Sequence, residues 1–186
     1  MSGYFVSLLS PIITFTSIVL LPLALYILLK PVNKNLALLA LFWRLAETTV
    51  LFIITLSSFF ILLLLSGADY LKVFETDQLH ALVMLLLNAH GTGYEIGIIF
   101  LALGSTVFNY LLFKSNYIPR ILATLGIFAS LFTLICTFAI LLLPNHAAML
   151  RQYIYLPFVD EVILGFWLLF KGVNVQQWDN RAPVSP

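Results

Sequence analysis

Two pairs of charged residues lie inside apolar stretches that are long enough to cross a membrane. Arg44 and Glu47 stand within residues 36–65, and Asp160 and Glu161 stand within residues 153–170. At the centre of a bilayer each charged group costs about 2.5 to 3.5 kcal/mol on insertion scales, so it must face a bundle interior or a wet cavity. Such charges can bind an ion, a proton or a small ligand, or they can form a structural ion pair that fixes helix packing.

The spacing of these residues indicates that they can meet. At about 100° per residue, Arg44 and Glu47 share one helix face with Thr48, Thr55 and Ser58. A rise of about 1.5 Å per residue places both charged pairs near the middle of the membrane, so we expect Arg44 to face Asp160 or Glu161. One arginine cannot neutralise three carboxyl groups, and at least one of them is expected to be protonated or hydrated.

Within residues 77–113, Glu95, His90 and His80 lie nearer the outer surface. If this segment is helical throughout, a narrow arc of it carries Asp77, His80, Asn88, Glu95, Thr106 and Asn109. Segment 90–95 lacks the paired histidine spacings that assemble metal ligands, so we predict a helix bend with an interfacial histidine there. We predict no metal site, no cofactor and no assigned catalytic residue. The candidate ligand or ion pathway comprises Arg44, Glu47, Glu95, Asp160 and Glu161. Its secondary residues are His90, Tyr94 and Asn88.

Composition limits the kind of protein that can contain these charges. Of 186 residues, 62% are hydrophobic and 9% are charged, which is typical of an integral membrane protein. The net charge of +1 leaves no basic face for nucleic acid, so we expect no nucleic-acid partner. The single cysteine, Cys136, excludes a disulfide within the chain and a cysteine-based metal motif.

The hydropathy pattern predicts an all-α membrane bundle over residues 1–172, followed by a polar tail at 173–186. The third span is too long for one crossing, since about 37 residues of helix reach about 55 Å against a hydrocarbon core of about 30 Å. We therefore expect it to be bent or broken near Gly91 and Gly93. The predicted spans are residues 5–29, 36–65, 77–113, 121–143 and 153–170.

The distribution of basic residues predicts the orientation, because cytoplasmic loops are enriched in lysine and arginine. Five spans leave only Lys72 and Arg151 on the outer side. The C-terminus is therefore expected in the cytoplasm and the N-terminus outside, with the first span retained because it lacks the features of a signal peptide. The basic residues on the cytoplasmic side are Lys30, Lys34, Lys114, Arg120, Lys171 and Arg181.

Small residues predict where helices approach closely. A face of span four carries Ala123, Gly126, Ser130, Thr133 and Thr137, and a face of span one carries Ser7, Ser10, Thr14 and Ser17. Gly93 and Gly97 fit a small-residue packing motif better than a phosphate loop, because no glycine-rich strand-to-helix turn is present.

Several separated segments together resemble a bacterial multi-pass membrane family catalogued as domain of unknown function 4386. They cover residues 30–35 continuing into Arg44 and Glu47, then residues 90–97, 115–120 and Glu161 with residues 167–174. The resemblance runs from about Leu21 to Asn174 and implies a multi-pass protein of the bacterial inner membrane. Members usually carry one more hydrophobic segment before the one that matches residues 5–29, which this chain is expected to lack. Because the family has no established activity, the resemblance assigns no catalytic residue.

Three functions fit these observations. The first is a module that binds or passes a small ligand, proton or ion through a polar intramembrane cavity. The second is an accessory or assembly subunit of a larger membrane complex, and the third is an intramembrane enzyme that uses His90 or Glu95 with a carboxylate. The expected partners are the lipid bilayer and either further copies of the chain or a larger complex.

Overall fold

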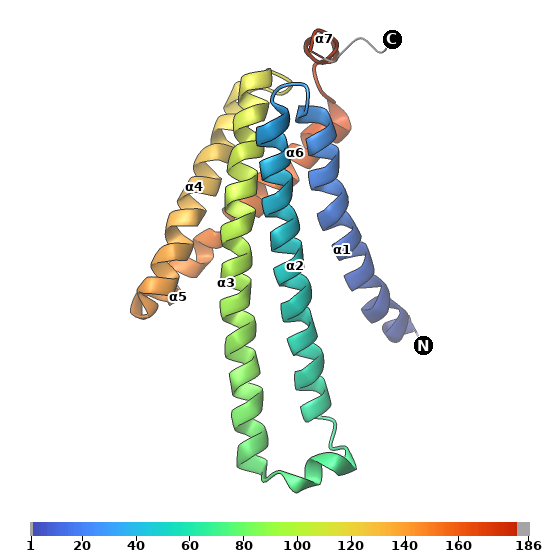
Figure 1. The fold of residues 1–186 in the computed structure, drawn as a ribbon, viewed down its shortest axis with the longest axis vertical. Coiled ribbons are helices and arrows are strands. Elements are labelled where there is room, and N and C mark those ends of the chain that lie inside the picture. The colour runs from blue at the N-terminus through green and yellow to red at the C-terminus, as the bar shows by residue number, and fades with distance from the viewer. Residues whose placement is uncertain (1, 182–186) are drawn as a thin grey trace.

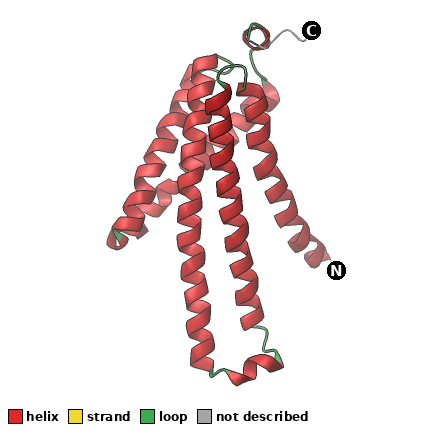
Figure 2. Cartoon of the chain, in the orientation of Figure 1, coloured by secondary structure: helices red, strands yellow, loops and turns green. Residues whose placement is uncertain are grey.

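The computed structural model describes the backbone of residues 2–181 and the side chains of residues 16–181 apart from residues 70 and 144. Within this part of the chain every regular element is a helix, which confirms the predicted all-α class (Figures 1 and 2). The long helices are α1 (Ser2–Leu29), α2 (Lys34–Leu64), α3 (Thr76–Ser115), α4 (Arg120–Leu142) and α6 (Leu156–Phe170). The short ones are η1 (Asp69–Val73), η2 (Pro144–His146), α5 (Ala147–Leu150), η3 (Arg151–Tyr155) and α7 (Val175–Asp179).

Four segments are long and apolar enough to cross a membrane: Lys34–Leu64, Thr76–Ser115, Arg120–Leu142 and Ala147–Phe170. These correspond to four of the five predicted spans. The described apolar part of α1, Thr16–Leu29, is shorter, so the crossing by residues 5–29 stays a prediction. Of the predicted span-one stripe, Ser7, Ser10 and Thr14 have side chains outside the described residues.

Polar residues set the ends of the long helices. The side chain of Asn33 accepts a hydrogen bond from the Leu36 amide at 3.0 Å and so caps α2. Glu75 and Gln78 form a reciprocal capping box at the start of α3. At the other end of α3, Asn116 adopts a left-handed conformation, with φ of 59°, and Pro119 precedes α4. The chain therefore reverses direction sharply where the sequence predicted turns.

The third span is long, as predicted, but the expected break near Gly91 and Gly93 does not occur. Helix α3 runs for 40 residues without interruption. Gly93 instead allows close packing, because a Cβ atom at this position would overlap Ile54 Cγ2 of α2. The glycine therefore serves the contact between two helices rather than a break within one.

Helices α2 and α3 form a long hairpin that projects beyond the other helices (Figure 1). Helix α1 lies beside α2, α4 lies beside α3, and α6 crosses behind the hairpin (Figure 1). At about 1.5 Å per residue, the 40 residues of α3 span about 60 Å, whereas the 23 residues of α4 span about 35 Å. About 25 Å of the hairpin therefore extends past the far end of α4.

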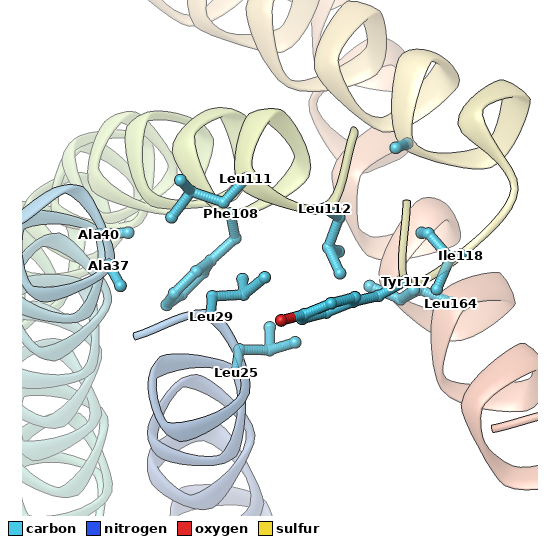
Figure 3. Packing of buried hydrophobic residues seen from close by; sticks show 11 residues of the cluster. Leu25, Leu29, Ala37, Ala40, Phe108, Leu111, Leu112, Tyr117, Ile118 and Leu164 are labelled. Atoms are coloured by element: carbon cyan, nitrogen blue, oxygen red, sulfur yellow. The ribbon is translucent and has the colours of Figure 1, made fainter. Parts of the chain in front are cut away.

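The largest apolar core lies at the end of the bundle that carries the α1–α2 and α3–α4 turns, which we call the closed end. Leu25 and Leu29 of α1 pack near Phe108 of α3 and near Tyr117 in the α3–α4 turn (Figure 3). The amide of Asn174 donates to the Tyr117 carbonyl at 2.9 Å, so the segment after α6 is attached to the same end. This packing holds the helices together next to the predicted charged pairs.

Candidate functional site

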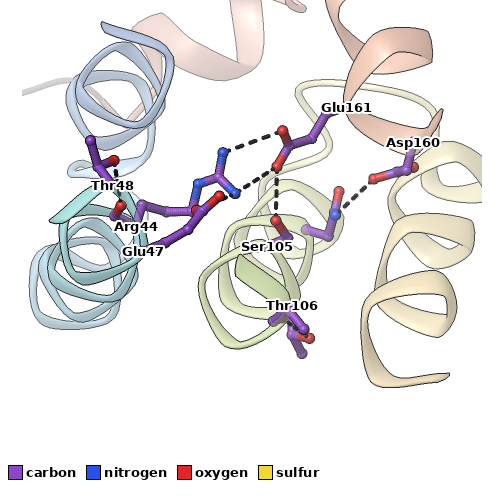
Figure 4. A network of polar contacts seen from close by, with 9 residues as sticks. Arg44, Glu47, Thr48, Ser105, Thr106, Asp160 and Glu161 are labelled. Atoms are coloured by element: carbon purple, nitrogen blue, oxygen red, sulfur yellow. Dashed lines mark hydrogen bonds and ion pairs between the residues drawn. The ribbon is translucent and has the colours of Figure 1, made fainter. Parts of the chain in front are cut away.

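Arg44 is the centre of a buried network of ion pairs. Its Nη1 lies 2.9 Å from Glu47 Oε2 and 3.1 Å from Glu161 Oε1, and its Nη2 donates to Glu161 Oε2 at 3.3 Å (Figure 4). The guanidinium thus makes a bidentate contact with both oxygens of Glu161, a geometry that strengthens and orients the ion pair. The Arg44 side chain is only 4% exposed, so water contributes little to its solvation. Of the two acids expected to face Arg44, the structure places Glu161 there.

Helix α3 supplies two further polar groups to the network. Ser105 Oγ donates to Glu161 Oε1 at 2.9 Å, and Asn109 Nδ2 donates to Asp160 Oδ2 at 3.0 Å. Asp160 and Glu161 are neighbours on α6 and point about 100° apart, so they contact different partners (Figure 4). Sequence reasoning aligned Asn109 with Glu95 but missed Ser105, although its spacing of four residues from Asn109 places both on one face.

Two glycines make room for these polar side chains. A Cβ atom at Gly104 would come within 2.8 Å of Arg44 Cγ, so the arginine stem lies directly over the α3 backbone. A Cβ atom at Gly126 of α4 would come within 2.5 Å of Asp160 Oδ2. The predicted small-residue face of span four therefore allows close approach to a buried acid.

A cavity of about 400 Å³ adjoins the Arg44 network. Its volume lies in the range of about 300 to 1,000 Å³ that is usual for small-molecule sites. Arg44, Glu47 and Glu161 bring charge to its lining, and most of its other walls are apolar, so the cavity is less polar than the sequence predicted. The remaining lining residues are Ile18, Leu51, Tyr94, Gly97, Ile98, Leu101, Ile154, Tyr155 and Phe158.

Glu95 does not join the Arg44 network. It lies ten residues before Ser105 on α3, which corresponds to about 15 Å along the helix axis. Its Oε1 instead accepts hydrogen bonds from Arg151 Nη2 at 2.9 Å and from Arg151 Nε at 3.3 Å. The Glu95 side chain is buried, whereas that of Arg151 is 60% exposed. The sequence pattern assigns Arg151 only to the outer side. The signal for its role is that a buried carboxyl group needs a cation beside it.

The secondary residues of the predicted pathway separate in the structure. Tyr94 lines the cavity. His90 Nδ1 lies 3.0 Å from the Ile54 carbonyl oxygen and 3.3 Å from Ser58 Oγ, so it links α3 to α2. Asn88 is exposed on the projecting part of α3. Among the residues that the structure describes, no group of three or more His, Cys, Asp or Glu side chains could hold a metal ion.

Comparison with known proteins decides the family. The sequence model of the family described as Domain of unknown function (DUF4386) matches residues 1–172. The chain belongs to this family. An uncharacterised protein from Archaeoglobus fulgidus is 27% identical over 156 residues, which cover 83% of this chain and 76% of the relative. No solved structure matches the chain.

Membership confirms the family that the sequence resembled and agrees with helices of membrane-spanning length and composition. The relative is archaeal, so similar sequences are not confined to bacteria, and a bacterial source for this chain stays a prediction. The family description names no reaction, ligand or partner.

Proposed function

We propose that this membrane protein binds a small ligand in the cavity between α1, α2, α3 and α6, and that Arg44, Glu47 and Glu161 form the polar end of the site. The observation that carries the proposal is that a buried carboxyl group, a partly buried one and a buried guanidinium border a cavity of about 400 Å³. Passage of the ligand, of a proton or of an ion across the membrane is the extension of this function that the predicted mid-membrane position of the charges favours.

A purely structural ion pair accounts less well for this arrangement. Breaking a buried pair is costly, yet keeping one is often no better than apolar packing, so a structural role alone favours tight enclosure of the charges. Here the charges border a cavity of about 400 Å³, which a structural role alone does not account for. A ligand that fills the cavity and bonds to its polar end accounts for both the cavity and the buried charges beside it.

We further propose that the closed end faces the cytoplasm of a prokaryotic cell. The basic residues assigned to the cytoplasm lie in or beside the turns and C-terminal segment at this end, whereas Lys72 and Arg151 lie towards the other. A reporter enzyme that is active only in the cytoplasm, fused after Pro186, should be active. Activity only of a periplasmic reporter at that position would contradict this orientation.

Native mass spectrometry of protein extracted in its own lipids tests ligand binding. We expect a specific mass other than bulk phospholipid on the wild type that is lost in Glu161→Gln, because the substitution removes the charge that pairs with Arg44. Glu95→Gln is the matched control, since it removes a buried carboxylate outside the cavity. A wild-type protein without a specific bound mass, or equal loss of that mass in both variants, would contradict the proposal.

The projecting hairpin supports a second candidate function, an accessory or assembly subunit. Its far half exposes large apolar side chains, including Phe59 at 56%, Phe60 at 55% and Leu85 at 64%. Since α3 is about twice as long as a hydrocarbon core of about 30 Å, lipid alone does not cover the whole of an upright hairpin. A photo-crosslinking residue at position 60 should then capture a defined protein partner or a second copy, while one at the exposed position 125 of α4 should not. Crosslinks to lipid alone at both positions would exclude this role.

A further inference from the structure

The apolar side chains that line the cavity favour a ligand that is itself mostly apolar. Leu51, Ile98, Leu101, Ile154 and Phe158 line it from α2, α3, η3 and α6. A sugar or another molecule with polar groups on every side would leave those groups without hydrogen bonds against these side chains, which is costly in an apolar site. The cavity is thus suited to a molecule that is apolar along its length and polar at one end.

The charges at the polar end favour a cation. Both oxygens of Glu161 already contact Arg44, and one of them also accepts from Ser105. Glu47 differs, because among the described residues it forms an ion pair with Arg44 alone, and its buried Oε2 has no hydrogen-bond partner. The Glu47 side chain is 93% buried, being 7% exposed, and it lines the cavity. A ligand that donates hydrogen bonds to Glu47 would complete its coordination.

An anionic ligand fits this end less well. Arg44 is the cation of the cavity lining, and its Nη1 is shared by Glu47 and Glu161 while its Nη2 donates to Glu161. An incoming anion would have to displace one of these carboxylates or lie beside both of them. The rings of Tyr94 and Tyr155 also line the cavity, and aromatic faces attract cations.

We infer that the ligand of this cavity is a cationic amphiphile, a single-chain molecule whose ammonium or similar basic head donates to Glu47 and Glu161 while its chain lies against Leu51, Ile98, Leu101 and Phe158. The inference rests on the proposed ligand-binding function and names the chemical class of the ligand. A two-chain phospholipid is too large for a cavity of about 400 Å³.

Three probes with the same chain and different heads test the inference: decylammonium, decanol and decyl sulfate. Each is added to the purified protein in nanodiscs of phosphatidylcholine, and the bound stoichiometry is read by native mass spectrometry. We expect one saturable decylammonium per protomer, with decanol and decyl sulfate bound about tenfold more weakly or not at all, because decanol brings no positive charge to the carboxylates and decyl sulfate brings a negative one.

Two tryptophan substitutions on α2 locate the binding. Leu51→Trp fills the cavity and should abolish saturable binding, whereas Ile53→Trp enlarges an exposed side chain on the same helix and should leave binding unchanged. Glu47→Gln preserves the shape of the side chain and should weaken decylammonium by about tenfold without a matching loss for decanol. It keeps the test decisive if Leu51→Trp does not fold.

The outcomes separate this inference from the proposed function. Saturable binding of decanol or decyl sulfate equal to or tighter than that of decylammonium, and blocked by Leu51→Trp, would overturn the cationic class while preserving the site. Absence of saturable binding by all three probes also overturns it. In that case a specific mass that is bound in native lipid and disappears in Leu51→Trp would still support the proposed function. A protein without a specific bound mass in native lipid would contradict both the inference and the proposed function.

Discussion

Replacing Gly126 by alanine probes the close approach of α4 to the buried Asp160. A Cβ atom at this position would lie within 2.5 Å of both Asp160 Oδ2 and Asn109 Cγ. Neither side chain can simply swing away, because they are joined by a buried hydrogen bond of 3.0 Å. The added methyl group must therefore break this bond or push α4 outward.

The expected loss of stability is about 2 to 4 kcal/mol. Overpacking typically costs about 1 to 3 kcal/mol, and loss of a charged hydrogen bond costs about 1.5 to 3 kcal/mol. Against these stands the better helix propensity of alanine, which contributes about 1 kcal/mol in soluble helices.

Unfolding in mixed micelles, followed by circular dichroism with increasing SDS, measures this change. Gly91→Ala and Gly165→Ala are matched controls, because both positions lie within helices and nothing lies within 4 Å of an added Cβ atom. We expect these controls to unfold at the same SDS fraction as the wild type or a higher one. Equal stability of Gly126→Ala and the controls would refute the packing of α4 against Asp160.

Three further substitutions test the contacts of the buried charges by the same unfolding assay. Arg44→Leu should destabilise by about 3 to 5 kcal/mol because it leaves the buried Glu47 and the partly buried Glu161 without their cation, and a change below about 1 kcal/mol would contradict the pairing. Ser105→Ala removes one donor to Glu161 and should cost about 1 kcal/mol, whereas no change would show that this donor is not used. Arg151→Gln should cost less than Arg44→Leu, and its effect should shrink as salt rises, because Arg151 is 60% exposed; an effect that is independent of salt would contradict this expectation.

Much of the helical architecture follows from the sequence because the membrane limits the choices. Apolar runs of sufficient length must form helices in lipid, and prolines and polar clusters mark their ends. The contact between Arg44 and α6 was also within reach, since the helical rise places both charged pairs at similar depth. The choice of Glu161 over Asp160 was not, because it depends on the rotation of α6 relative to α2 and α3.

The points at which sequence reasoning fell short concern contacts between helices. Gly93 fits both a helix break and a small-residue packing motif, and only its apposition to Ile54 decides for packing. Glu95 shares an arc of α3 with Asn109, yet angular alignment does not bring residues together along the axis. Its contact with Arg151 depends on the path of η3, which no local pattern in the sequence specifies.

An experimental density map of the protein in discs of its native lipid tests the central claim most directly. We predict non-protein density in the cavity, elongated along Leu51 and Phe158 and ending within hydrogen-bonding distance of Glu47 or Glu161. A map in which side chains have closed the cavity while Arg44 keeps both of its carboxylate partners would contradict the claim and leave the charges a structural role.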